Sequence, residues 1–155
     1  MPPESPPEKS FPLNESLFYQ IVRTAMHMKT GLYRELHNAG LGITPEQWSV
    51  LSCLWEAQGL SHHEVGLRTG RDKFTISRIL KLLQKKGLVF KQPDPRDRRR
   101  SSIHLTSEGQ ALQTPLTQIV ESYCTRIFRD LTSDEIAYLQ RVHEHIIANI
   151  DRLSR

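Results

Sequence analysis

The chain has 155 residues, 37% hydrophobic and 25% charged, which is ordinary for a globular protein with a single core. Two cysteines, Cys53 and Cys124, form neither a disulfide framework nor a metal-binding spacing. No apolar run approaches the roughly 20 residues that span a bilayer, and no signal pattern opens the chain, so a cytoplasmic protein without membrane contact is expected. The net charge of +4 fits a nucleic acid or another acidic surface, but only weakly.

Residues 1–12 hold five of the nine prolines, which predicts a disordered or extended tail. Asn14 is the predicted cap of a first helix, and Gly40 and Gly42 end it. This helix carries apolar residues on one broad face. They are Leu17, Ile21, Val22, Ala25, Met28, Leu32 and Leu36.

Two capping boxes predict the next two helix starts. The segment TPEQ at 44–47 adds a proline at the first helical position, and SHHE at 61–64 has the same spacing. Gly59 and Gly70 end these helices. The residues expected to face inward are Trp48, Leu51, Leu54, Trp55, Val65 and Leu67.

Asp72 is the predicted cap of a fourth helix, which Gly87 ends. Its buried stripe recurs at intervals of three and four residues, at Ile76, Ile79, Leu80 and Leu83. The opposite face carries Phe74, Ser77, Arg78, Lys81 and Lys85.

Residues 88–90 and 103–105 read as paired strands. Pro93 and Pro95 are expected in the loop between them, since proline cannot sit in a central ladder. Thr106 is predicted to cap a long helix that is perturbed near Pro115 and runs to about Phe128. A third capping box, TSDE at 132–135, opens the last helix. Its apolar residues are Ile136, Leu139, Val142, Ile146, Ile147 and Ile150.

This order predicts a mainly α fold with a small β-hairpin wing, a winged helix-turn-helix. Residues 41–110 would form the DNA-binding domain, and 13–40 and 111–155 the dimerisation helices. One small module cannot cover both apolar terminal faces, and faces of that size usually mark a partner surface. The natural partner is a second copy, so the fold includes N- and C-terminal dimerisation helices.

The basic charge is concentrated between residues 71 and 100. This stretch has eleven Lys or Arg and three Asp, a net charge of +8, so the rest of the chain sums to −4. Such a concentration in one supersecondary unit is typical of a surface that neutralises DNA phosphates. Double-stranded DNA is therefore the expected partner.

The segments ITPEQWSVL, DKFTISRILKLLQKKGLV and DPRDRRRSSIHLTSEG resemble the MarR (multiple antibiotic resistance regulator) family of bacterial transcription factors. The resemblance covers about residues 14–150. It implies an obligate homodimer built from the first and last helices that binds pseudo-palindromic operators. It commonly implies a ligand cleft between the dimer lobe and the DNA lobe. The chain departs from the family at Phe74, where a small residue or proline is more usual.

A recognition helix reads base edges from its N-terminal half. The DNA-binding residues predicted there are Lys73, Phe74, Thr75, Ser77, Arg78 and Lys81. Arginine can pair bidentately with guanine, and serine suits several base edges. Phe74 has two readings, contact with a thymine methyl or folding back onto the neighbouring helix. The alternative for the polar residues is an ordinary solvated face.

The turn between the strands carries Arg96, Arg98, Arg99 and Arg100, which repel one another in an idle loop but are attracted to a narrow minor groove. Asp97 would be repelled by phosphate, so it is predicted to organise the wing by pairing with Arg99. Arg98 is then the favoured tip. The alternative is a charged turn without DNA contact.

His62 and His63 could reach phosphate or be solvated, and His143 and His145 lie on different helix faces and cannot chelate one metal. By the family analogy, His27, His37 and Trp48 are candidate ligand-binding residues for a small aromatic effector, but they serve equally well in a core or interface. No nucleophile–base set, phosphate loop or metal cluster is recognisable, so neither an enzyme nor a cofactor is expected.

The expected function is a homodimeric, ligand-responsive repressor that binds specific DNA. An activator, or a regulator without a ligand, is the alternative within this class. An architectural protein that binds DNA by charge alone is the alternative from another class. The capped recognition helix argues against it, because binding by charge needs no defined groove reader.

Overall fold

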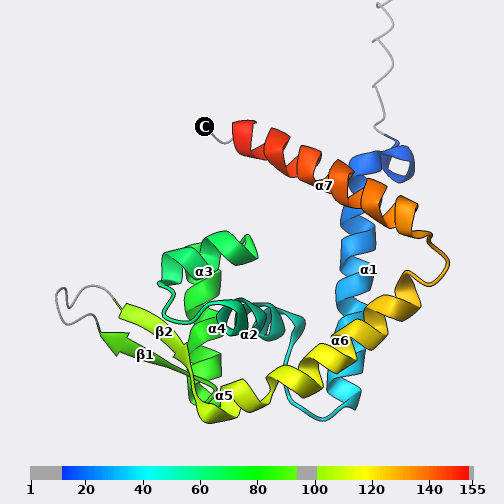
Figure 1. Cartoon of the computed structure of the whole chain (residues 1–155). Coiled ribbons are helices and arrows are strands. Elements are labelled where there is room, and N and C mark those ends of the chain that lie inside the picture. Colours follow the sequence, from blue (N-terminus) through cyan, green and yellow to red (C-terminus); the bar gives the residue numbers. More distant parts are fainter. Residues whose placement is uncertain (1–11, 94–100, 154–155) are drawn as a thin grey trace, which may run out of the picture. The chain divides into compact units, whose positions relative to one another are not determined.

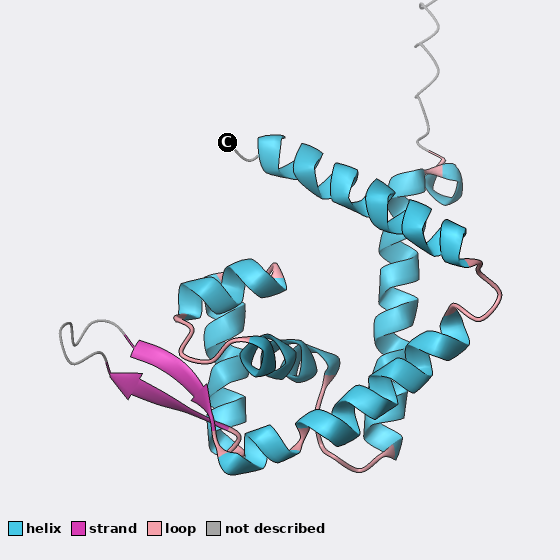
Figure 2. Cartoon of the chain, viewed as in Figure 1, coloured by secondary structure: helices cyan, strands magenta, loops and turns pink. Residues whose placement is uncertain are grey.

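The computed structural model describes residues 12–93 and 101–153 (Figure 1). The chain divides into two compact units, Met1–Ile119 and Val120–Arg155. Helices dominate both, and the described strands form one antiparallel hairpin in the first unit (Figure 2). Residues 1–11 of the predicted tail and the arginine-rich turn at 94–100 lie outside the described residues. Among the described helices, none combines the length and apolar character that crossing a membrane requires.

The first long helix, α1 (Leu17–Asn38), is capped by Ser16 and not by Asn14 as the sequence predicted. The Ser16 hydroxyl accepts the Tyr19 amide at 3.5 Å, and its extended backbone suits an N-cap. Asn14 is displaced from this role because it lies inside a 3₁₀ turn, Leu13–Glu15. Only Leu32 and Leu36 of the predicted apolar face are buried, and Leu17 is 66% exposed.

Both predicted capping boxes are confirmed, in α2 (Pro45–Glu56) and α3 (His62–Thr69). In α2 the Gln47 amide donates to the Thr44 hydroxyl at 3.2 Å, and the Thr44 amide donates to the Gln47 side chain at 3.3 Å. In α3 the Ser61 amide donates to the Glu64 carboxylate at 2.7 Å. These reciprocal bonds satisfy amides that a helix start leaves without partners, so the sequence fixes where α2 and α3 begin.

The core of the first unit forms where α2, α3 and α4 (Lys73–Lys85) meet (Figure 1). The predicted inward stripe of α4 is confirmed, since Ile76, Leu80 and Leu83 are fully buried and Ile79 is 3% exposed. Leu51, Leu54, Val65, Ile103 and Leu116, from other elements of the same unit, are also fully buried. Leu67 does not join them. It is 69% exposed, and Trp48 and Trp55 are only half-buried.

The wing consists of β1 (Val89–Pro93) and β2 (Ser101–Leu105), paired antiparallel from Val89↔Leu105 to Pro93↔Ser101. Pro93 therefore ends a strand, where the sequence had predicted a loop residue. Among the described strands β1 pairs with β2 alone and is an edge strand, so Pro93 does not interrupt a central ladder. The α2–α3 loop adds a bridge to β2: the Ile103 amide donates to the Leu60 carbonyl at 2.8 Å, and the Gly59 amide donates to the Ile103 carbonyl at 2.9 Å.

The helix after the wing is broken in two, α5 (Ser107–Ala111) and α6 (Gln113–Ile127), where one perturbed helix was predicted. Pro115 explains the break because it has no amide to donate to the Ala111 carbonyl. Gly109 in α5 lies directly against the backbone before β1. A Cβ there would fall 2.0 Å from the Leu88 carbonyl oxygen, so only glycine permits this approach.

In the second unit, α7 (Ser133–Leu153) begins at the third predicted capping box. The Thr132 amide donates to the Glu135 carboxylate at 2.7 Å, and the Glu135 amide donates to the Thr132 hydroxyl at 3.3 Å. No described residue of α7 is buried within the chain. Leu139 is 42% exposed and Ile147 58% exposed, which leaves an apolar face available for a partner.

Candidate nucleic-acid interface

The exposed face of α4 carries most of the helix residues predicted to contact DNA. Five of them are exposed, namely Lys73, Phe74, Ser77, Arg78 and Lys81. Thr75 is half-buried. Lys85, which the sequence placed on this face but not in the site, is also exposed, and lies three helical turns beyond Phe74 on the same side. This face therefore presents a row of cations, Arg78, Lys81 and Lys85, called the cationic row below. Lys73 and the polar residues Thr75 and Ser77 lie beside it.

Asp72 fixes the start of this helix. One carboxylate oxygen accepts the Phe74 and Thr75 amides, both at 2.9 Å, and the other accepts the Thr75 hydroxyl at 2.5 Å. These hydrogen bonds, that of the Thr75 side chain foremost, lower the pKa of Asp72. Thr75 therefore contributes to the cap at the N-terminal end of α4, the half of the helix that was predicted to read base edges.

Phe74 is 86% exposed. It does not fold back onto the neighbouring helix, so one of its two predicted readings is removed. Helical spacing places it opposite the stripe formed by Ile76, Ile79, Leu80 and Leu83.

Two basic residues of the +8 stretch are turned toward α2. The Lys86 ammonium donates to the Gly42 carbonyl and, at 2.8 Å, to the Gln47 side chain, and burial lowers the pKa of Lys86. The Arg71 guanidinium donates to the Ser49 hydroxyl at 3.4 Å, and its Nε is buried with no hydrogen-bond partner among the described residues. Lys86 nevertheless stays exposed, and Arg71 is half-buried. A count of charges could not show that these two side chains are hydrogen-bonded to other parts of the fold.

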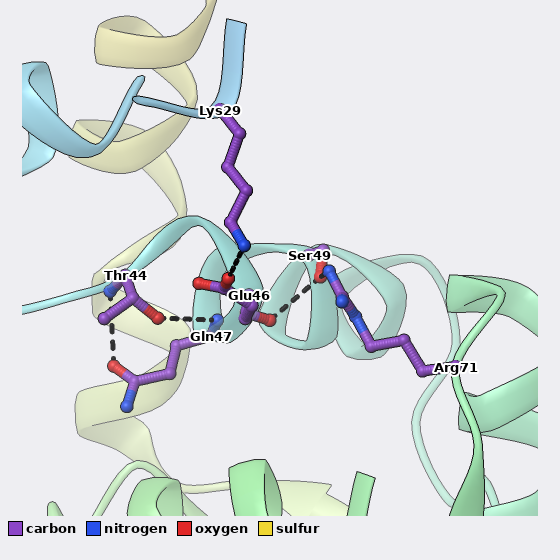
Figure 3. Close-up of polar contacts among 6 residues, drawn as sticks. All are labelled: Lys29, Thr44, Glu46, Gln47, Ser49 and Arg71. Carbon is purple, nitrogen blue, oxygen red and sulfur yellow. Dashed lines mark hydrogen bonds and ion pairs between the residues drawn. The ribbon is translucent and has the colours of Figure 1, made fainter. Parts of the chain in front are cut away.

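A chain of polar contacts runs from α1 across α2 to the residue before the α4 cap (Figure 3). Lys29 of α1 forms an ion pair with Glu46, whose carbonyl accepts the Ser49 hydroxyl at 2.8 Å. Ser49 in turn accepts from Arg71. Partial burial raises the pKa of Glu46, but the hydrogen bond from Lys29 and further favourable contacts outweigh it, and the pKa is lowered.

The N-terminus of α3 lies near the same surface. His62 is half-buried, whereas His63 is exposed. Burial lowers the pKa of His62, and the positive charges of Lys91 and Lys73 lower it further. A nearby phosphate would act in the opposite direction, because it favours the imidazolium.

On the wing, Lys91 and Gln92 of β1 are exposed. The predicted contacts Arg96, Arg98, Arg99 and Arg100, and the predicted organiser Asp97, lie outside the described residues. Lys91 had been counted in the basic stretch but not assigned to the site. At the wing base, Phe90 stacks on His104 with ring centroids 5.5 Å apart, which stiffens the hairpin where it joins the core.

The candidate ligand residues are not brought together. His27 and His37 are both exposed on α1, ten residues and so about 15 Å apart along its axis, and Trp48 is half-buried on α2. His37 stacks on Tyr33, at 5.9 Å between centroids. Within the described part of the chain, no group of three or more His, Cys, Asp or Glu could hold a metal ion.

The contact made by Trp55 was not anticipated from the sequence, which predicted only that this residue faces inward. The Trp55 indole donates to the Gly109 carbonyl at 3.1 Å, which ties α2 to α5. A half-buried tryptophan whose N–H needs an acceptor is the only signal that the sequence offers for this contact.

Comparison with known proteins agrees with this arrangement. The sequence model described as "MarR family" matches residues 41–100. The homoprotocatechuate degradative operon repressor of Escherichia coli is 31% identical over 107 residues, covering 68% of this chain and 72% of that protein. The transcriptional regulator PrsX of Escherichia coli is 29% identical over 150 residues, covering 95% and 89%.

Solved structures share the fold. A MarR family regulator from Silicibacter pomeroyi is 27% identical with a TM-score of 0.73, covering 89% of this chain and 92% of that one. MepR of S. aureus, solved with DNA, is 24% identical with a TM-score of 0.79, covering 86% and 98%. This chain therefore belongs to the MarR family of winged helix-turn-helix transcription regulators.

Proposed function

We propose that the protein is a homodimeric repressor that binds a pseudo-palindromic operator and releases it when a small molecule binds. The single observation that carries the DNA-binding part is the α4 face. The helix α4 is capped by Asp72 and packs its apolar stripe into the core. Its other face presents Lys73, Ser77, Arg78 and Lys81 to solvent. A rigid reader of this kind suits base-edge recognition in a major groove.

The homodimer is supported by the apolar terminal helices. Leu17, Phe18 and Met26 of α1 are 66%, 73% and 64% exposed, and α7 has no buried described residue. Covering such faces stabilises by about 25 cal/mol per Å² of apolar surface. Segments 13–40 and 111–155 are accordingly proposed as the dimerisation helices, and 41–110 as the DNA-binding domain.

Repression and ligand release rest on the relatives. The homoprotocatechuate regulator and IacR of Pseudomonas putida are both named repressors. The operon named in the first case degrades an aromatic acid, which supports a small aromatic effector here. His27, His37 and Trp48 stay its candidate contacts. The relatives regulate transcription, so we assign no catalytic step, and we propose a cytoplasmic location.

Selection of bound DNA from random sequence tests the proposal. A two-fold symmetric site is expected, with half-sites centred about 34 Å apart, one helical turn. Footprinting of one asymmetric half-site by one subunit would contradict the dimeric mode. Release by aromatic acids, added to the selected complex, tests the effector separately. If the protein keeps its full operator affinity across a panel of aromatic acids at millimolar concentration, the proposal of an aromatic effector fails and the proposal of operator binding stands.

The alternative is an architectural protein that binds by charge. The basic residues of the wing segment and the cationic row of α4 are compatible with this alternative. The exposed Phe74 and Ser77 on the same face of α4 argue against it, because binding by charge alone does not need them. Selection distinguishes the two, since an architectural protein would enrich no sequence and its affinity would follow salt alone.

A further inference from the structure

Phe74 is an unusual residue for its position. It is the second residue of α4 and is 86% exposed, whereas Phe90 on the wing is 44% exposed and stacks on His104. Its amide is fixed by the Asp72 carboxylate at 2.9 Å, so the backbone that carries the ring is held in place. A large aromatic ring is thus presented to solvent at the reading end of the helix.

The neighbours of Phe74 restrict what can cover it. Residues four, seven and eleven positions further share its side of α4. They are Arg78, Lys81 and Lys85, all exposed. A partner that covers the ring must also approach this cationic row, which favours a polyanion. The major groove of DNA meets both demands, because it offers one apolar group, the C5 methyl of thymine.

We propose that Phe74 determines specificity by packing its ring against a thymine methyl in each half-site of the operator. The inference rests on the proposed operator binding by α4. The phenyl ring has no donor or acceptor, so it cannot satisfy the exocyclic amine of cytosine. It selects thymine through the methyl group and through the cost of placing a polar base edge against carbon.

The test removes the C5 methyl group of thymine without changing the hydrogen-bonding groups of the base. After an operator has been selected, each thymine is exchanged in turn for deoxyuridine, and affinity is measured for the full-length protein and for Phe74→Ala. At one position the exchange should weaken the unaltered protein about fourfold per half-site, the effect of one buried methyl. The same exchange should leave Phe74→Ala unaffected. At that position, 5-methylcytosine should bind the unaltered protein more tightly than cytosine.

Two controls separate this role from a structural one. Phe74→Leu should retain part of the sensitivity to uracil because it keeps an apolar side chain. Leu82→Ala removes another exposed apolar residue of α4, 44% exposed, and should not change that sensitivity. Circular dichroism of each variant checks that α4 is intact.

The outcomes are distinct. If uracil has no effect at any position, or weakens the protein and Phe74→Ala equally, the inference is overturned while operator binding stands. A half-site without thymine would overturn it in the same way. If selection enriches no sequence, the proposed function fails and the inference fails with it.

Discussion

At the scale of single residues, Asp72 has two opposing effects on DNA binding. Its carboxylate holds the Phe74 and Thr75 amides and so orders the first turn of α4, which we propose reads the operator. Its negative charge also stands on a surface that would approach phosphate. Ordering and repulsion predict opposite results when the residue is changed, so a substitution decides which one dominates.

Asp72→Ala should weaken operator binding several-fold, although it removes a negative charge. The cap is lost, and the first turn of α4 with Phe74 and Ser77 loses its fixed geometry. Asp72→Asn removes the same charge but keeps a good cap, so its affinity should equal or exceed that of the parent protein. Fluorescence anisotropy on the selected operator measures both. Equal tightening by Ala and Asn would show that repulsion dominates.

His62 should make the fold sensitive to mild acid. Its pKa is lowered from about 6.5 in the folded chain, by burial and then by Lys91 and Lys73. Between the folded and unfolded pKa values the unfolded chain binds more protons, so the free energy of unfolding decreases as the pH falls through about 6.5. His62→Gln removes this contribution. The drop in melting temperature between pH 7.5 and 5.5 should therefore be smaller in the variant, and an equal drop would contradict the assignment.

At the scale of elements, helix starts were the most predictable feature. Three capping boxes, the Asp72 cap and the α4 stripe follow from local spacing alone, and the structure reproduces them. The prediction that Asn14 caps α1 was wrong because Asn14 lies in a 3₁₀ turn before the helix. The prediction that Pro93 lies in a loop was wrong because an edge strand tolerates proline. Such features depend on neighbours that a single segment does not contain.

The basic site could be predicted only in outline. Helical periodicity predicts which residues lie on the outer face of α4. The orientations of Lys86 and Arg71 depend instead on contacts with Gln47 and Ser49, which lie more than twenty residues earlier in the chain. A count of charge includes every lysine and arginine equally. Tertiary contacts decide which of them are hydrogen-bonded to other elements, as Lys86 is although its side chain stays exposed.

Two lysines of one segment test this distinction. Lys81→Ala removes an exposed charge, so the slope of log affinity against log salt should decrease by about 0.9 per lost phosphate contact. Lys86 is exposed too, but its ammonium is hydrogen-bonded to Gly42 and Gln47, so Lys86→Ala should leave the slope nearly unchanged. It should instead lower the melting temperature, because the Gly42 carbonyl and Gln47 side chain lose their donor. Titrations at several salt concentrations, with thermal melts, separate the two, and equal slopes for both variants would contradict the assignment.

At the scale of the whole molecule, the compact first unit and the α7 unit have different requirements. The first has a fully buried set of side chains from several elements, whereas α7 buries none of its described residues within the chain. Obligate interfaces often bury more than 2,000 Å², which a pair of long apolar helices can provide. The apolar residues of α7 are therefore available for burial against a partner.

Ile147→Glu should convert the proposed homodimer to a monomer and abolish operator binding. Ile147 is 58% exposed, so a charge there leaves the protomer core intact but is costly in a buried interface. His145→Glu introduces the same side chain at an exposed position on another face and should stay dimeric. Sedimentation at micromolar concentration measures both. A monomeric parent protein, or a dimeric Ile147→Glu variant, would contradict the interface.

The bridge between Ile103 and the α2–α3 loop has a consequence for motion within the first unit. The Ile103 amide is bonded to the Leu60 carbonyl, and the residue is fully buried. Its proton can reach solvent only if the loop and the wing base separate, which also opens the core between the helices. In native-state hydrogen exchange, this amide should be replaced by deuterium only through global unfolding, so the wing base and the helix-turn-helix form a single cooperative foldon.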